Sequence, residues 1–134
     1  MLVAGTLQSG FLDMAVNPSI DVATAAQRFA GVLMSWASGA QAMGIPAVVS
    51  VAAAQAGFMA GERLPMILSK FWPTVVFAGM VAPPVGPPMA EPLVAPTADA
   101  AGAAQTLATA IQSNAMMQTV TFLVGGVPTV FPIV

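Results

Sequence analysis

A seventeen-residue segment occurs twice in this chain, and the duplication strongly restricts the folds open to it. DVATAAQRFAGVLMSWA spans Asp21–Ala37, and DAAGAAQTLATAIQSNA spans Asp99–Ala115, 78 positions later. Eight of the seventeen aligned pairs are identical: Asp21/Asp99, Ala23/Ala101, Ala25/Ala103, Ala26/Ala104, Gln27/Gln105, Ala30/Ala108, Ser35/Ser113 and Ala37/Ala115. Each copy starts with aspartate, a preferred helix N-cap residue. The sequence therefore predicts two similar helices capped by Asp21 and Asp99.

Both copies place apolar residues at three- and four-residue steps, which is typical of amphipathic helices. The first apolar stripe is Val22, Ala25, Ala26, Phe29, Val32, Leu33, Trp36 and Ala40, and the second is Ala100, Ala103, Ala104, Leu107, Ala110 and Ile111. The opposite faces are polar but carry only one charge, that of Arg28. We expect helices over about 21–43 and 99–118, packed in the same layer.

The two copies are also followed by similar segments. GIPAV at 44–48 is echoed by GVPTV at 126–130, at an offset of 82 instead of 78, so the second copy has four extra residues before this segment. In this longer segment after the second copy, Thr119–Val124 places Val120, Phe122 and Val124 on one face, which predicts a strand. Gly44 and Pro46 are expected to end the first helix.

The remaining segments complete the predicted organisation. Residues 49–60 and 62–72 read as helical, 74–82 as extended, and the run PPVGPPMAEPLVAP at 83–96 as a stiff connector without a regular element. We divide the chain into an N-terminal arm (1–20), a first helical half (21–82), a Pro-rich connector (83–98), and a second helix with a C-terminal strand or tail (99–134). The predicted fold class is mainly α, with one short C-terminal β segment.

Charge is scarce in this chain. Only 6% of the residues are charged, against about 25% in ordinary soluble domains. Eight ionisable side chains cannot cover a solvated surface of this size, so copies of the chain, other proteins or lipid are expected to cover part of it. The net charge of −2 offers no attraction for nucleic acid, and we expect none to bind.

The residues for common catalytic chemistry are absent. The chain has no His and no Cys, so the usual nucleophile–base pairs cannot form. Capping accounts for Asp21 and Asp99, Glu62 and Arg63 read as a local ion pair or turn, and the other carboxylates are isolated. We therefore expect no enzyme activity, no metal and no cofactor.

A membrane protein is the alternative from another class. The uncharged stretches 29–61, 71–90 and 100–134 are each long enough to span a bilayer. The first holds five polar side chains, the second is broken by prolines, and the third opens with a polar helix face. No cluster of Lys or Arg flanks them, and the N-terminus lacks the basic region of a secretory signal.

Large aromatic side chains are the candidate anchors for partner proteins, because Trp and Phe dominate interface energetics. Phe71 and Trp72 stand directly before Pro73 and have two interpretations, a partner anchor or a core plug beneath the connector. The other candidate anchors are Trp36, Phe122 and Phe131.

These features together resemble a family of known proteins. The chain resembles small virion structural proteins of contractile-tailed bacteriophages, which are encoded among tail and baseplate genes. The resemblance rests on a helix opening D-x-A-x-A-A-Q at Asp21, a central Phe-Trp before a Pro-rich crossing, and a second helix AAQTLATAI that runs into TVTFLVGGVPTV. The similarity covers most of residues 20–134. The second helix departs from the family pattern at Asn114, where an aromatic residue is expected, and the connector is unusually rich in proline.

The resemblance implies a non-enzymatic virion component present in multiple copies. Two similar faces in one chain suit a ring or cap in which each subunit touches two neighbours. The expected partners are therefore other copies of the chain and other tail, baseplate or neck proteins, and the expected location is the virion. A small membrane-embedded or membrane-penetrating protein remains the alternative.

Overall fold

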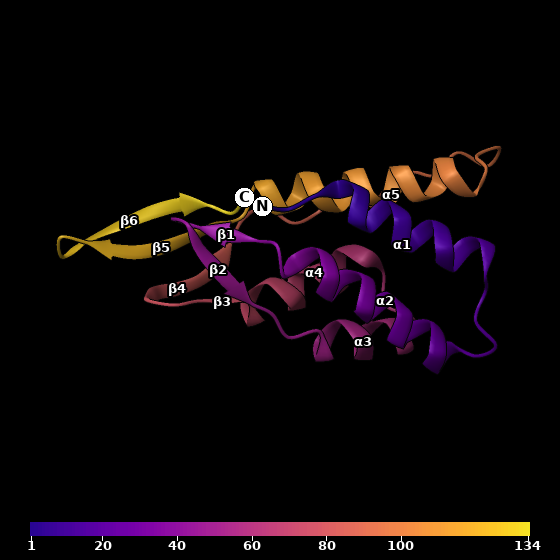
Figure 1. Cartoon of the computed structure of the whole chain (residues 1–134), viewed down its shortest axis with the longest axis horizontal. Coiled ribbons are helices and arrows are strands. Elements are labelled where there is room, and N and C mark those ends of the chain that lie inside the picture. Colours follow the sequence, from indigo (N-terminus) through magenta and orange to yellow (C-terminus); the bar gives the residue numbers. More distant parts are fainter.

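The computed structural model describes residues 1–134 as an elongated molecule with helices at one end and strands at the other (Figure 1). The helices are α1 (Ala4–Val16), α2 (Val22–Ala37), α3 (Ala52–Met59), α4 (Leu64–Phe71) and α5 (Ala100–Met116), with a 3-10 turn at Trp72–Thr74. The strands are β1 (Gln41–Ala42), β2 (Ile45–Val48), β3 (Val76–Phe77), β4 (Met80–Val85), β5 (Thr119–Val124) and β6 (Val127–Pro132). They form two antiparallel sheets, β1-β2-β3 and β4-β5-β6.

The prediction of a mainly α fold is wrong, because the protein is mixed α/β. Helices hold 49% of the residues and strands 19%, in two three-stranded sheets. Two of the six strands, β1 and β3, have only two residues each, too few to show an alternating pattern. Three others contain proline, which reads in a sequence as a strand breaker.

The duplicated unit is a helix followed by a β-hairpin. The β1–β2 turn is Met43-Gly44 and the β5–β6 turn is Gly125-Gly126, all four with positive φ of 52° to 79°. Two consecutive positive φ values define the two-residue hairpin turn whose twist matches its strands. Strand β5 has six residues and β1 has two, a difference of four that equals the change in offset from 78 to 82.

Each hairpin tolerates proline because of its place in the ladder. Pro46 lies opposite Gln41, and Pro128 lies opposite Leu123, in each case one pair beyond the pair that closes the turn. Hydrogen-bonded and non-bonded pairs alternate in an antiparallel ladder. The proline nitrogen therefore faces away from its hairpin partner, where no donor is required. Gly44 and Pro46 thus belong to a hairpin, and they do not end the preceding helix as predicted.

The first predicted helix is shorter than expected, and the strands explain why. Helix α2 ends at Ala37 and not near Met43, because Gln41 is held in a strand. Gln41 N donates to Val134 O and Val134 N donates to Gln41 O, both at 2.9 Å. This pair of bonds joins the end of the second hairpin to the start of the first and links the two sheets.

Residues 1–20 are not merely an arm, since most of them form helix α1. Leu7 and Phe11 are buried, and α1 packs against both α5 and α2 (Figure 1). A Cβ atom on Gly10 would lie 2.5 Å from Cγ2 of Val32, so glycine permits the close approach of α1 and α2. Helix α1 therefore packs against both of the similar helices, α2 and α5.

The predicted connector also begins as regular structure. Strand β4 runs through Pro83 and Pro84 to Val85, with irregular register against β5. Val85 O accepts a hydrogen bond from Thr119 Oγ1 at 3.3 Å, and Pro84 is buried. The connector without regular structure therefore starts at Gly86, and the predicted strand 119–124 is present as β5.

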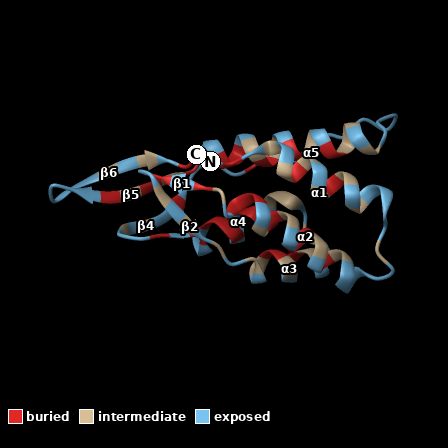
Figure 2. Ribbon diagram, viewed as in Figure 1, coloured by how far each residue is buried: buried red, intermediate tan, exposed pale blue.

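One hydrophobic core runs from the helices into the sheets (Figure 2). Its largest fully buried side chains are Trp36, Phe71, Phe77, Phe122, Leu7, Leu33, Leu68, Ile111, Ile133, Val75 and Val120. The second helix of the duplicated pair buries small residues, Ala104, Ala108 and Ala115, which let α1 lie close to it. Both ends of the molecule thus share one core.

The helix caps and one ion pair predict how stability depends on pH. Asp21 Oδ1 accepts a hydrogen bond from Thr24 N at 2.7 Å, and this bond lowers the pKa of Asp21 below 3.8. The hydrogen bond from Arg28 lowers the pKa of Asp13 in the same way, and a second bond comes from Asn17. Such carboxylates stabilise the fold above their unfolded pKa, and the contribution is lost as pH falls through the lower, folded pKa.

We expect the Tm to fall as pH drops below about 4, and to fall less in the double variant Asp13→Asn, Asp21→Asn. Asparagine keeps a capping oxygen but cannot titrate. Thermal melts by circular dichroism at pH 2.5 to 7 measure this. The control is Glu91→Gln, which removes a carboxylate that makes no hydrogen bond or ion pair. An acid response of the double variant equal to that of the wild type would contradict the assignment.

Candidate functional site

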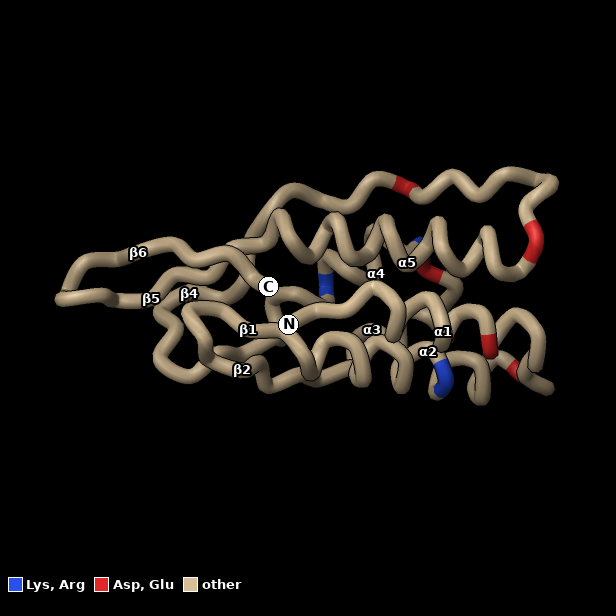
Figure 3. The backbone as a smooth tube through the Cα atoms, turned by 45° about the horizontal axis from the view of Figure 1, so that its top comes forward, with Lys and Arg blue, Asp and Glu red and all other residues tan.

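The sheet end of the molecule carries no charged side chain (Figure 3). All eight ionisable side chains lie on helices, helix caps or loops: Asp13, Asp21, Arg28, Glu62, Arg63, Lys70, Glu91 and Asp99. None of the six strands includes a charged residue. Charge is therefore segregated, and the sheet end is the least hydrated part of the surface.

The outer face of the β4-β5-β6 sheet is apolar and uncovered. Val120 and Phe122 of β5 point into the core, so alternation along the strand places Leu123 on the other side. The residues of this outer sheet face, taken from the cross-strand pairs, are Val85, Thr119, Thr121, Leu123, Pro128, Val130 and Pro132. Val85, Leu123 and Val130 are 64%, 54% and 59% exposed.

This arrangement differs from that of an ordinary antiparallel sheet. Such sheets usually bury one apolar face and present polar side chains on the other. Here the outer face is mostly aliphatic: Val85, Leu123 and Val130 are more than half exposed beside the half-buried Thr119 and Thr121. An exposed apolar face of this kind marks a site of contact with another molecule. The outer sheet face is therefore the candidate functional surface.

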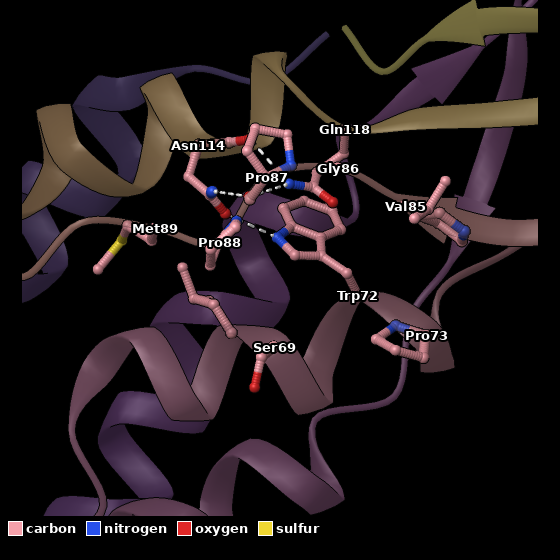
Figure 4. Close-up of a pocket in the computed structure, with 12 residues that line it drawn as sticks. Ser69, Trp72, Pro73, Val85, Gly86, Pro87, Pro88, Met89, Asn114 and Gln118 are labelled. Atoms are coloured by element: carbon pink, nitrogen blue, oxygen red, sulfur yellow. Dashed lines mark hydrogen bonds between the residues drawn. The ribbon is translucent and has the colours of Figure 1, made fainter.

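Behind this surface, a set of buried side-chain amides holds the connector in place (Figure 4). Trp72 Nε1 donates to Asn114 Oδ1 at 3.1 Å, and Asn114 Nδ2 donates to Pro87 O at 3.1 Å. Gln118 Nε2 donates to the same Pro87 O at 3.4 Å and to Asn114 O at 3.3 Å. We call Trp72, Pro87, Asn114 and Gln118 the amide clasp.

The amide clasp also requires a residue without a side chain. A Cβ atom on Gly86 would lie 2.6 Å from Met117 O and 2.8 Å from Gln118 Nε2. Beside the clasp is a small hollow of about 190 Å³ with twelve lining residues, none of which is titratable. The residues around this hollow position the connector.

The second tryptophan is held by the same helix. Trp36 Nε1 donates to Gln112 Oε1 at 2.8 Å, and Gln112 Nε2 donates to Leu2 O at 3.2 Å. Trp36 and Trp72 meet edge to face, with ring centroids 6.0 Å apart. Helix α5 therefore satisfies both indole N–H groups, one through Gln112 and one through Asn114.

The structure places most of the predicted interface anchors inside the chain. Trp36, Phe71, Trp72 and Phe122 are all buried, so they are covered by this chain and do not lie on its surface. For Phe71 and Trp72 this corresponds to the core plug beneath the connector. Phe131 is half-buried and packs against Phe122, with ring centroids 5.8 Å apart.

The predicted helix caps lie where capping requires them. Asp99 Oδ1 accepts a hydrogen bond from Gly102 N at 2.7 Å, as Asp21 does from Thr24. Sequence reasoning missed the buried amides of Asn114 and Gln118, because a helical pattern does not distinguish a buried amide from one on a polar face. The available signal was the position of Asn114, which aligns with the buried Trp36 of the first copy.

Four of the eight titratable side chains form two isolated ion pairs. Arg28 binds Asp13 at 2.9 Å and Lys70 binds Glu62 at 2.7 Å. No group of three or more metal-ligating acidic, His or Cys side chains is gathered anywhere in the structure. None of the helices combines the length and the hydropathy that crossing a membrane requires. Comparisons with protein-family models, curated proteins and solved structures found no match.

The amide clasp predicts a large effect from one substitution. Asn114→Ala leaves the buried Trp72 N–H without an acceptor and takes one donor from Pro87 O, so we expect a loss of about 1–3 kcal/mol of unfolding free energy. Urea denaturation followed by tryptophan fluorescence measures this loss. Ser113→Ala, one position away and exposed, is the matched control and should change stability by less than about 0.5 kcal/mol. Equal stabilities of the two variants would contradict the role of the clasp.

Proposed function

We propose that this chain is a non-enzymatic structural component of a phage virion. It assembles in multiple copies with itself and with other tail, baseplate or neck proteins. The resemblance of its duplicated helices and Pro-rich crossing to small virion proteins supports the class. The exposed apolar residues of the outer sheet face are the observation that supports assembly.

The outer sheet face favours burial against protein for a simple reason. Removing apolar surface from water contributes roughly 25 cal/mol per Å², and fully burying one Val or Leu side chain contributes about 1.5–3 kcal/mol. Val85, Leu123 and Val130 are more than half exposed in the single chain. Several such side chains at each contact would hold neighbouring copies together without ion pairs.

The lack of charged residues on the strands also favours their burial against other copies of the chain. Burying an ion costs several kcal/mol unless a partner compensates for its lost hydration. Strands without ionisable groups can be buried against a neighbour without that cost. A self-contact also brings equal surfaces close together, and an uncharged surface avoids like-charge repulsion there. The charge distribution therefore suits repeated copies.

We expect the purified chain to form an oligomer whose mass is unchanged between about 0.1 M and 1 M salt. Salt screens surface ion pairs strongly but leaves apolar contacts in place. Multi-angle light scattering at both salt concentrations measures the mass. A monodisperse monomer at both would remove the assembly proposal, and dissociation at high salt would show that ion pairs hold it.

The virion assignment has a separate test. Mass spectrometry of purified virus particles from the source of this sequence should detect the chain in several copies relative to a single-copy virion protein. Its absence from particles would exclude a virion role even if the purified chain forms oligomers. Recovery with the lipid fraction after carbonate extraction would favour the membrane alternative.

A further inference from the structure

An apolar hollow of about 380 Å³ lies among the helices, and no strand residue lines it. All five helices contribute to its lining, and eight of the nine lining residues are hydrophobic: Phe11, Met14, Ala15, Phe29, Phe58, Leu64, Ile67 and Leu107, with Glu62 as the ninth. Stacked aromatic rings form one wall, with Phe29 centred 6.2 Å from Phe11 and 5.0 Å from Phe58. A hollow of this size is within the range of ligand-binding sites.

The single polar residue of the lining has an unused acceptor. Glu62 Oε1 accepts a hydrogen bond from Lys70 Nζ at 2.7 Å. Glu62 Oε2 is buried and has no hydrogen-bond partner. A buried polar atom without a partner is costly and rare in folded proteins. The hollow thus combines an apolar lining with a carboxylate that lacks one donor.

The tip of the second hairpin has the complementary properties. Leu123, Val124 and Val127 are 54%, 47% and 61% exposed, and no charged residue lies on either strand. A Cβ atom on Gly125 or Gly126 would meet nothing within 4 Å, so the turn touches no other part of the chain. The backbone N–H groups of these two glycines make no hydrogen bond within the protein.

We infer that the β5–β6 hairpin tip of one copy inserts into the helical hollow of the next copy. This inference rests on the proposed assembly and adds a second contact to that of the outer sheet face. Val124 and Val127 fill the apolar hollow, and the narrow Gly125-Gly126 turn brings backbone N–H donors to the Glu62 carboxylate.

The chain itself points to a second copy as the occupant. The four residues that distinguish the second hairpin from the first are those that lengthen β5, and the longer hairpin projects beyond the other strands (Figure 1). The projection and the hollow lie at opposite ends of the molecule. The tip has exposed apolar side chains that its own chain does not cover, and the hollow has an apolar lining and a carboxylate oxygen without a hydrogen-bond donor. The properties of the two features are therefore complementary.

Insertion of one end into the opposite end is a heterologous contact. Such contacts close into a ring when the rotation between copies divides a full turn, and otherwise continue as a filament. Every copy then uses its tip once and its hollow once. The outer sheet face stays available for neighbouring strands of the assembly or for other virion proteins.

Disulfide trapping tests the contact directly, because the chain has no cysteine of its own. Val127→Cys at the tip and Ala15→Cys at the hollow are purified separately, mixed and oxidised gently, and the products are separated without reductant. We expect the mixture to cross-link at least about tenfold faster than a mixture of Val127→Cys with Ser113→Cys, an exposed position on α5 outside the hollow.

Two results would overturn the insertion. Val127→Cys cross-linking with itself as fast as with Ala15→Cys would mean that tips meet tips. A wild-type oligomer with no trapped Ala15–Val127 pair would mean that the contact lies elsewhere, while the proposed assembly stands. A wild-type chain that stays monomeric at all concentrations removes both proposals together.

A charge at the tip gives a second readout that does not depend on cysteine chemistry. Val127→Asp places a carboxylate into the apolar hollow beside Glu62, so we expect the concentration for half-assembly to rise at least about tenfold. Leu93→Asp, at an 88% exposed position of the connector, is the matched control and should assemble as the wild type does. Circular dichroism verifies that both variants are folded. Unchanged assembly of Val127→Asp would overturn the insertion.

Discussion

Side-chain amides on and just after helix α5 position both tryptophans, the N-terminus and the connector relative to that helix. Gln112 and Asn114 of α5 accept the indole N–H groups of both tryptophans. Gln112 also donates to Leu2 O of the N-terminus, and Asn114 and Gln118, which follows the helix, donate to Pro87 O of the connector. Each bond fixes a helix or a connecting segment relative to α5. A buried polar network of this kind specifies one arrangement, because a shift of one residue would leave several groups without partners.

The sequence predicted the helices and missed much of the β structure, for physical reasons. Periodicity and capping residues located α2 and α5, because a long amphipathic pattern is a strong local signal. Helix α1 begins at Ala4 after the N-cap residue Val3, whose side chain makes no capping bond, and it depends on packing against α5 and α2. A two-residue strand such as β1 exists only through its partners, Ile45, Pro46 and Val134, so no local pattern can indicate it.

The sequence predicted that part of the surface is covered by another molecule, but it did not predict which residues form that surface. Composition alone indicated that some surface must be covered by another molecule, since eight charges are too few for a solvated domain of this length. The aromatic residues were natural candidates for that surface, yet Trp36, Phe71, Trp72 and Phe122 are buried. Burial follows from contacts between residues far apart in the sequence, and it leaves the aliphatic residues of β4, β5 and β6 to form the exposed apolar face.

Proline placement determines which part of the sheet can take part in assembly. Opposite pairs alternate along the ladder, so the backbone groups of Pro128, Val130 and Pro132 face the open edge of β6. Only Val130 of these three has an N–H group, so an added strand would find a single donor along that edge. Such an edge resists strand-by-strand aggregation, a constant hazard for a neutral, apolar sheet. The residues on the face and at the tip remain free to make contacts, so association through side chains is favoured over uncontrolled growth of the sheet.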